Sequence, residues 1–403
     1  MSTTAPQLVA PAGNFEKLKI ACHYGADAVY LGDSRFSLRA MAKNFNEEEL
    51  KLAIEYAHDT GTKAYITANI FPHNRDIGLL KDYAHLLKQL GPDGIIVSDA
   101  GIFCMIKEIA PDIPLHISTQ ANITNFESAR FWEKMGAKRL ILARELSLDD
   151  IKEIREKVSL ELEIFVHGSV CLSYSGRCYL SSFLAYKSAN RGMCTNSCRW
   201  NYTLMEEKRP GHYFPVFEND RGTYILSSKD LCLIEHLPAI KEAGITSIKI
   251  EGRMKGINYV GGVVKTYREA IDSLNNHPFT IKDNWLKELS AFSNRGYTSG
   301  KLFGDTDRLS YNFDGTNYRK SHDFIGIIMN VKNKSAEIEL RNKLYCGDTI
   351  EFLTPGLEDT PFQVASISDL DGNPREYGNT QERVIIPAPS MVRNYDLIRR
   401  KIE

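Results

Sequence analysis

Residues 63–99 have the sequence KAYITANIFPHNRDIGLLKDYAHLLKQLGPDGIIVSD. This stretch contains an apolar segment, Ala64–Thr67, then polar residues, an amphipathic helical stretch, Gly91 and a second apolar segment, Ile95–Val97. Glycine favours the left-handed backbone conformation that ends a helix before the chain turns into the next strand. The stretch therefore predicts a strand–helix–strand unit, and strands this apolar are typical of a parallel sheet buried on both faces.

The same unit repeats along the first two thirds of the chain. Helix ends are predicted at Gly25, Gly61, Gly91, Gly136 and Gly244. Eight strand–helix units favour a closed, TIM-like (β/α)8 barrel over an open doubly wound sheet. The eight predicted strands are Leu8–Ala10, Ala28–Leu31, Ala64–Thr67, Ile95–Val97, Leu115–Ser118, Leu140–Leu142, Leu162–Val166 and Ser247–Ile250.

The domain organisation follows from where this spacing breaks. We predict a barrel catalytic domain over residues 1–290, with a cysteine-rich insertion over 168–228 at the carboxyl end of the seventh strand, where barrel enzymes build their sites. A linker over 291–322 and a small all-β barrel or sandwich domain over 323–403 complete the chain. The short alternating strands predicted in this last domain are Ile325–Val331, Ala336–Leu340, Thr349–Leu353, Phe362–Ser366 and Arg383–Ile386.

Composition excludes several classes of protein. The chain of 403 residues has 43% hydrophobic and 25% charged residues and a formal net charge of −1, so nothing global draws it to nucleic acid or membrane. Neither a signal peptide nor an apolar run of about 18 residues is visible, which predicts a cytoplasmic protein with no membrane partner. Any contact with RNA then needs a local basic patch, and the segment Arg393–Lys401 offers one, although a solvated basic end is the simpler explanation.

Five cysteines give the sharpest chemical signal. Cys171, Cys178, Cys194 and Cys198 fall within 28 residues, and Cys232 follows the next barrel element. In a reducing compartment such thiols are metal ligands, nucleophiles or core residues rather than disulfides. No Cys-x2-Cys pair and no histidine at ligand spacing are present, which favours an iron–sulfur cluster over zinc. Packed or reactive thiols are the alternative.

Polar residues follow the predicted strands at the edge that becomes one mouth of a barrel. Loops are polar in general, but as a set these residues predict a polar pocket. They are Asn69, Ser98, Asp99, Ser118, Thr119, Gln120, Arg144, Glu145, His167, Lys229, Asp230, Lys249, Glu251 and Arg253.

Within that set, three cations are suited to an anionic small molecule, because guanidinium groups hold carboxylates through two hydrogen bonds. We predict catalytic roles for Arg144, Glu145, His167, Lys249, Glu251 and Arg253.

Protease motifs are scarce. The chain has neither a His-Glu-x-x-His zinc helix nor a Gly-x-Ser-x-Gly nucleophile elbow. His167 precedes Cys171 by four residues, so a Cys–His pair is conceivable if the fold brings the two side chains together.

Longer motifs resemble a known family. The stretch EIFVHGSVC at 163–171, followed by GRCYLS at 176–181, resembles the signature of the collagenase-like peptidase family U-thirty-two. Four further stretches are similar to it: LVAPAG at 8–13, NRGMC at 190–194, SSKDLC at 227–232 and KIEGR at 249–253. The resemblance spans about residues 7–275, and the C-terminal segment resembles the family's C-terminal domain.

This resemblance implies a chemistry. Characterised relatives are oxygen-independent hydroxylases with a four-cysteine 4Fe–4S cluster, and the RNA-acting relatives depend on prephenate. The family pattern places the ligands at Cys171, Cys178, Cys194 and Cys232, with Cys198 as an alternate.

A length of 403 residues with one β domain resembles the branch that converts the wobble uridine of tRNA to 5-hydroxyuridine. That uridine must leave its stack, and Tyr174, Tyr179 or Trp200 are candidates to stack on it. A collagenase-like peptidase and a non-catalytic RNA-binding protein are the alternative functions.

Overall fold

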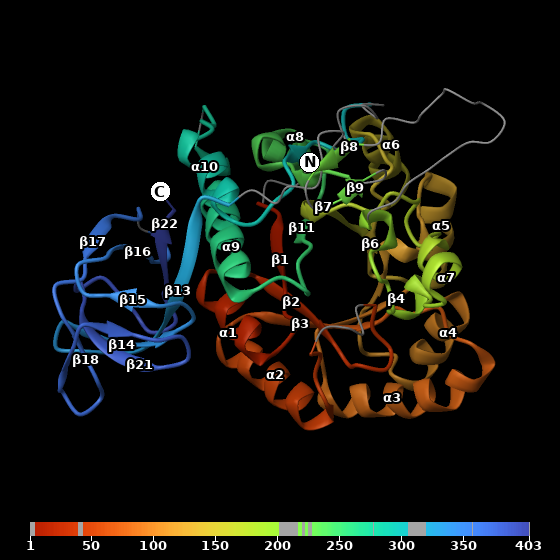
Figure 1. Cartoon of the computed structure of the whole chain (residues 1–403). Helices are drawn as coiled ribbons and strands as arrows, with labels where there is room; N and C mark the ends of the chain where they lie inside the picture. Colours follow the sequence, from red (N-terminus) through yellow and green to blue (C-terminus); the bar gives the residue numbers. More distant parts are fainter. Residues whose placement is uncertain are drawn as a thin grey trace.

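Eight parallel strands close into a barrel in the first domain, and a β domain packs beside it (Figure 1). The structure is a computed structural model of the chain and describes residues 5–38, 43–200, 217–219, 222–224, 228–276, 278–304, 320–356 and 358–402. No helix within these ranges is both long and apolar enough to cross a membrane.

The barrel strands pair in sequence order, and the barrel closes where the seventh strand meets the eighth, which in turn pairs with the first. All eight predicted strands are confirmed. Nearly every residue in them is buried, as expected for a sheet that is covered on both faces. The strands are β1 (Gln7–Pro11), β2 (Ala28–Gly32), β3 (Lys63–Ala68), β4 (Gly94–Val97), β5 (Leu115–Ile117), β6 (Arg139–Ile141), β7 (Glu161–Ser169) and β11 (Ser247–Ile250).

A ring of helices covers the outside of the barrel (Figure 1). The five predicted helix-end glycines all have positive φ, from 61° at Gly91 to 91° at Gly25, as a left-handed cap requires. At the other ends, Asn14, Asn46 and Asp99 accept hydrogen bonds from the first turn. The helices are α1 (Phe15–His23), α2 (Glu47–Asp59), α3 (Ile77–Leu90), α4 (Ala100–Ile109), α5 (Phe126–Met135), α6 (Leu148–Lys157), α8 (Leu237–Glu242) and α9 (Ile257–Asp272).

The insertion leaves the barrel after β7 and returns beside it. Its described part holds helix α7 (Leu180–Ala185), two short 3-10 turns and the strand pair β8 (Phe217–Asn219) and β9 (Gly222–Tyr224). The returning strand β10 (Asp230–Cys232) runs antiparallel to the end of β7, and Leu231 lies opposite Gly168.

Part of the range expected to be a linker packs on the barrel instead. After α10 (Asp283–Ala291), strand β12 (Tyr297–Thr298) extends the barrel sheet by pairing with β10. The Arg295 guanidinium binds the Asp230 carboxylate at 2.6 Å, and both groups are buried. This segment looked like a linker because its sequence is rich in turn residues and does not reveal that its partner, Asp230, lies 65 positions earlier in the chain.

The C-terminal domain is all-β, as predicted, and consists mainly of one eight-stranded antiparallel sheet. Its core contains Ile325, Ile338, Leu340, Ile350 and Ile398. The strands, in their order across the sheet, are β17 (Pro361–Gln363), β16 (Thr349–Leu353), β22 (Leu397–Lys401), β13 (His322–Lys332), β14 (Ser335–Leu340), β21 (Arg383–Pro387), β18 (Ile367–Ser368) and β19 (Pro374–Arg375); β15 (Leu344–Tyr345) and β20 (Tyr377–Gly378) form a separate pair.

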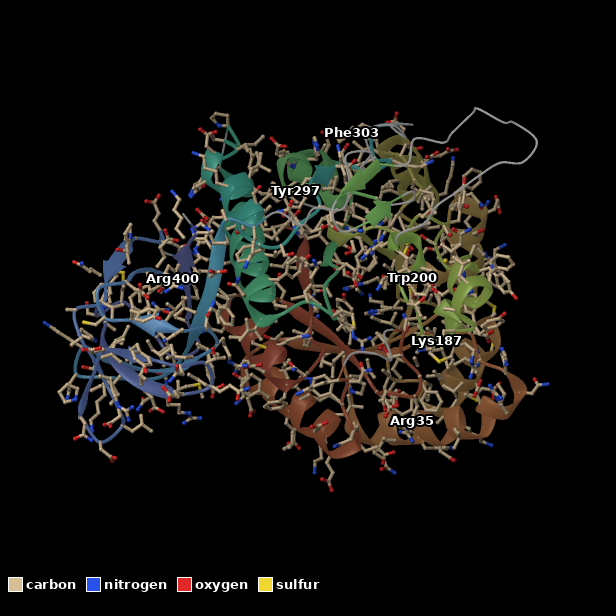
Figure 2. All side chains as sticks on the ribbon, in the orientation of Figure 1. Arg35, Lys187, Trp200, Tyr297, Phe303 and Arg400 are labelled. Atoms are coloured by element: carbon tan, nitrogen blue, oxygen red, sulfur yellow. The ribbon has the colours of Figure 1, made fainter. Side chains whose placement is uncertain are left out.

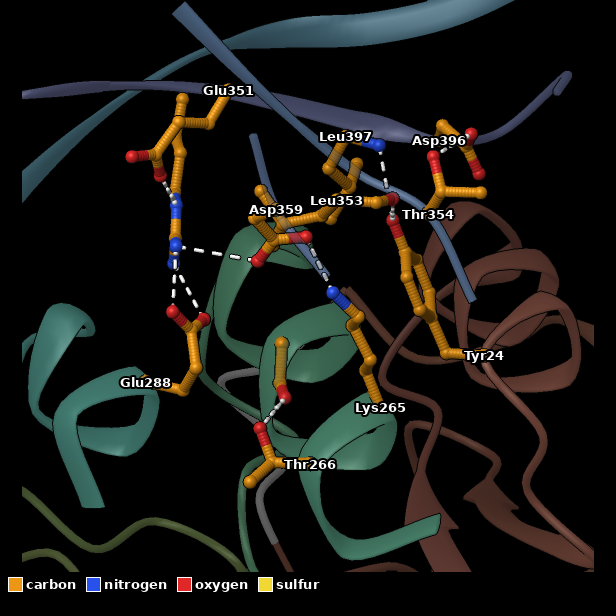
Figure 3. Close-up of polar contacts among 12 residues, drawn as sticks. Tyr24, Lys265, Thr266, Glu288, Glu351, Leu353, Thr354, Asp359, Asp396 and Leu397 are labelled. Atoms are coloured by element: carbon orange, nitrogen blue, oxygen red, sulfur yellow. Dashed lines mark hydrogen bonds and ion pairs between the residues drawn. The ribbon is translucent and has the colours of Figure 1, made fainter. Parts of the chain in front are cut away.

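The interface between the domains corrects the interpretation of the basic segment Arg393–Lys401. Its second half is β22, paired on both sides, and Arg399 is buried against the Glu288, Glu351 and Asp359 carboxylates at 2.7–3.3 Å (Figure 3). The cation at Arg399 is therefore neutralised within the protein and does not provide a surface for RNA.

Candidate active site and metal centre

A cavity of about 420 Å³ opens at the barrel mouth, between the strand ends and the insertion. Ten of the predicted mouth residues line it: Asn69, Ser118, Thr119, Gln120, Arg144, Glu145, Lys229, Lys249, Glu251 and Arg253. Four do not. Asp99 caps α4, Ser98 donates to backbone carbonyls, Asp230 binds Arg295, and His167 is described below.

A buried charge network supports the cavity floor. Glu163, on β7, accepts from Lys249 Nζ at 2.8 Å and from Arg139 Nη1 at 2.9 Å, and all three side chains are almost fully buried. Burial alone would raise the pKa of Glu163, but the Lys249 ammonium and the Arg139 guanidinium lower it to about 2. Lys249 also lies over the Tyr30 ring. Its charge is therefore already balanced before any ligand binds.

The two arginines at the mouth differ in what already holds them. Arg253 is buried and donates to Ser37, to the Leu38 carbonyl at 3.0 Å and to Asn44, which fixes the segment after β2. Arg144 stacks on the Phe165 ring, with its guanidinium carbon 4.0 Å from the centroid, and donates to the Ser169 carbonyl. No carboxylate in the described ranges forms an ion pair with Arg144, so its charge is the better placed for an anionic ligand.

Glu145 presents a carboxylate to the same cavity. One oxygen, Oε1, accepts from the Ser175 backbone N–H at 2.8 Å and lies 3.2 Å from the Ser175 hydroxyl. The other, Oε2, is buried and has no hydrogen-bond partner among the described residues. A buried acceptor of this kind is costly unless something donates to it, which fits a ligand N–H or O–H.

His167 lies outside the cavity. Its ring is buried among Tyr259, Tyr267 and Tyr297, with centroids 5.4–5.9 Å away, and burial lowers its pKa to about 3. A neutral imidazole in this aromatic setting is a core residue, so the Cys171–His167 pair is not formed in this structure.

Four of the five cysteines line the same cavity. Cys171, Cys178, Cys194 and Cys198 all line it, and none forms a disulfide. Burial raises the pKa of Cys198, the Arg199 guanidinium lowers it, and the Cys171, Cys194 and Cys178 thiols raise it further. The Asn196 N–H lies 3.4 Å from Cys194 Sγ. Within the part of the chain that the structure describes, no three His, Cys, Asp or Glu side chains already stand in a metal-binding arrangement.

Cys232 is placed differently. Leu231 and Leu233 line the cavity, and because side chains alternate along a strand, Cys232 points to the opposite face. There its Sγ lies 3.9 Å from the Tyr267 hydroxyl, and burial raises its pKa to about 11. The geometry therefore groups Cys198, rather than Cys232, with the other three thiols.

Sequence reasoning missed two parts of this site. The network of Arg139 and Glu163 was visible only as charges inside otherwise apolar strands, a signal that deserves a functional or ion-pair explanation. The contact of Ser175 with Glu145 joins residues 30 positions apart and has no local signature.

Fold and site together define a (β/α)8-barrel protein with a thiol-lined cavity at its mouth and an antiparallel β domain at its C-terminus. The model of Peptidase family U32 matches residues 13–312, and the model of the Peptidase family U32 C-terminal domain matches residues 320–399. The chain belongs to this family.

Several curated relatives are similar over most of their length. The chain is 41% identical over 376 residues to "tRNA hydroxylation protein P1" of Bacillus subtilis, covering 92% of this chain and 89% of that protein. It is 38% identical over 396 residues to "tRNA hydroxylation protein P" of Escherichia coli, covering 87% and 86%. It is 31% identical over 421 residues to "Collagenase" of Porphyromonas gingivalis, covering 98% and 97%.

Proposed function

We propose that this protein is a cytoplasmic tRNA-modifying enzyme that converts the wobble uridine to 5-hydroxyuridine without molecular oxygen, using a 4Fe–4S cluster and prephenate. The observation that carries the proposal is the gathering of four thiols on the wall of a cavity that also contains Arg144 and Glu145. The relatives named as tRNA hydroxylation proteins support the choice of substrate.

The reaction requires more than a binding pocket. Replacing the C5–H of uridine by C5–OH adds one oxygen atom and removes two electrons from the base, so in this proposal prephenate gives up the oxygen atom and is itself reduced by those two electrons. The cluster, when bound, supplies the electron transfer. Thiolates without nearby imidazoles are ligands suited to iron–sulfur chemistry, and the four cavity cysteines fit that donor set.

Arg144 is the residue we assign to one of the two carboxylates of prephenate. Its guanidinium is held by the Phe165 ring and the Ser169 carbonyl, which leaves it oriented but not neutralised by a described carboxylate. Lys249, in contrast, already binds Glu163, and Arg253 is already used to hold Ser37 and Asn44. Both cations line the cavity, but their contacts within the protein give them a structural role at its floor and side.

Glu145 is suited to recognising the base. The imide N–H of uracil is a donor, and the buried Oε2 of Glu145 is an acceptor with no partner in the described residues. A carboxylate that accepts from this N–H would favour uracil over cytosine, whose N3 is an acceptor.

The ligand set can be tested by iron content. Cys171→Ala, Cys178→Ala and Cys194→Ala are each expected to lose most of the iron of anaerobically reconstituted protein, together with the broad thiolate-to-iron absorbance. The fourth ligand is the discriminating case: as the side chains stand, Cys198→Ala should lose iron and Cys232→Ala should retain it. The reverse result would assign the fourth position to Cys232 and require β10 to rearrange. Cys346→Ala, in the β domain, is the control.

The function is tested by mass spectrometry of tRNA from a deletion strain. We expect loss of 5-hydroxyuridine at the wobble position, restored by the wild-type chain and not by Cys171→Ala. Wobble hydroxylation that persists unchanged in the deletion strain would overturn the proposal.

A peptidase is the second candidate, because a relative named "Collagenase" matches 98% of the chain. The buried position of His167 removes the one Cys–His pair that the sequence suggested. Cleavage of gelatin by the purified wild-type protein, abolished in Cys171→Ala, would support this function against ours.

A further inference from the structure

Helix α7 exposes aromatic side chains to solvent and buries a serine. Tyr179 and Tyr186 cap the two ends of α7, and Phe183 lies between them in the helix, four and three residues away, which is the spacing of neighbours on one side of a helix. Such a stripe normally faces the core. Here the three side chains are 72%, 72% and 95% exposed. We call these three residues the aromatic stripe.

The buried side chain of α7 is polar. Ser181 is 2% exposed, and its hydroxyl lies 3.2 Å from the Thr195 hydroxyl and 3.9 Å from Cys194 Sγ. Tyr174, Met193 and Trp200, elsewhere in the same excursion, are exposed as well. The helix therefore packs its serine side on the cysteine loop and presents its aromatic side to solvent, a reversal of the usual pattern.

Tyr186 adds a backbone observation. It ends α7 in the left-handed conformation, with φ 54° and ψ 27°, where glycine or asparagine is the usual residue. A tyrosine there is strained, and its almost fully exposed side chain gains little packing to offset the strain. A bulky, exposed residue at such a position adds little to the stability of the fold, which points to a role in binding.

The charge around the aromatic stripe is one-sided. Residues 170–200 contain four basic residues, Arg177, Lys187, Arg191 and Arg199, and no acidic residue, in a chain whose net charge is −1. Arg191 pairs with Asp76, whereas Arg177 and Lys187 are exposed. Figure 2 shows Lys187 and Trp200, both from the insertion, on the same side of the barrel.

We propose that the aromatic stripe binds the unpaired nucleotides that flank the target uridine in the tRNA loop. Aromatic faces stack on bases whatever their identity, and nearby cations attract the phosphates. The position fits, because Leu180 at the start of α7 lines the cavity together with Cys178 and Tyr174. The inference rests on the proposed function and adds to it the surface that holds the RNA outside the cavity.

The test is binding of a fluorescent RNA hairpin with uridine in its loop, measured by anisotropy on the full chain. We expect Tyr179→Ala and Phe183→Ala each to weaken binding by about tenfold. Tyr186→Gly is the most discriminating variant, because it should weaken RNA binding and raise the melting temperature. The melting temperature should rise because glycine adopts the left-handed conformation without strain. A protein that has simply been damaged would lose both.

Phe131→Ala is the matched control. Phe131 is 49% exposed on α5, and no residue of that helix lines the cavity. Its affinity for the hairpin should equal that of the wild type. Unchanged affinity for the hairpin in a triple variant of the aromatic stripe would overturn the inference. Self-association of the wild type that the triple variant abolishes would also overturn it, because it would show that the stripe binds a second copy of the chain.

The two proposals fail separately. If the deletion strain loses wobble hydroxylation but the triple variant binds RNA normally, only the inference about the aromatic stripe fails. If the deletion strain keeps its hydroxylation, the proposed function fails regardless of what the stripe binds.

Discussion

The outer helices of the barrel bury apolar side chains, whereas helix α7 buries a polar one and exposes aromatic ones. Helix α9 buries Val260, Val263 and Val264 completely against the barrel, whereas α7 buries Ser181 and exposes Phe183. Burying apolar surface contributes about 25 cal/mol per Å², so α9 stabilises the fold and α7 contributes much less. The comparison indicates that the barrel supplies stability, while the insertion is selected for what it contacts. Substitutions in the two regions should therefore have effects of different kinds.

The largest effect on stability is expected at the barrel floor. Glu163→Gln removes the carboxylate between Lys249 and Arg139 and leaves two buried cations with one fewer counter-charge. Breaking a buried ion pair in this way typically costs about 3–5 kcal/mol. Urea denaturation measures the free energy of unfolding. Glu127→Gln, which breaks an exposed pair with Arg130, should change it by less than about 1 kcal/mol.

A somewhat smaller effect is expected where the two domains meet. Arg399→Ala leaves Glu288, Glu351 and Asp359 without their shared cation, and we expect a loss of about 3 kcal/mol. Arg400→Ala is the adjacent control: Arg400 is 27% exposed where Arg399 is 3% exposed, and among the described residues it pairs with Asp348 alone, so its loss should cost about 1 kcal/mol or less. Equal losses in the two variants, measured by calorimetry, would show that the interface does not depend on Arg399.

The next prediction concerns acid stability. The folded pKa of His167 is about 3, below its ordinary value of 6.5. Between these values the unfolded chain binds a proton that the folded chain does not, so stability falls as the pH falls through this window. From pH 6.5 to 5 the loss is about 2 kcal/mol. His167→Gln should flatten this acid limb in denaturation measured at several pH values, whatever it does to stability at neutral pH.

The smallest effect has the opposite sign and lies in the insertion. Tyr186→Gly should stabilise the protein by up to about 1 kcal/mol, because it removes a left-handed tyrosine whose side chain is 95% exposed. Differential scanning calorimetry would measure the shift in melting temperature. Destabilisation instead would mean that Tyr186 is part of the packed structure, and the contrast between the two regions would weaken.

The sequence predicted what local signals encode. The barrel strands and the helix-end glycines were correct because each strand is apolar throughout and each glycine has the positive φ that the turn requires.

What escaped prediction depends on partners distant in the chain. Arg399 looked like part of a basic surface because Glu288, 111 residues away, cannot be recognised as its partner from the sequence. The spacing of the cysteines could not decide whether Cys198 or Cys232 joins the other three thiols. The side of the sheet that Cys232 faces is set by the alternation of side chains along β10, which has only three residues. His167 suggested catalysis because its three tyrosine neighbours come from α9 and β12.

The pairing of Leu231 on β10 with Gly168 on β7 brings the exit and the return of the insertion side by side on two adjacent strands. The chain therefore leaves and re-enters the barrel at adjacent points, and the described part of the insertion is held further by side-chain contacts such as Ser175–Glu145 and Arg191–Asp76. Its length can change without displacing any barrel strand. A lineage could therefore replace or lose the four cavity thiols together with the rest of the excursion, while the eight-stranded framework beneath folds as before.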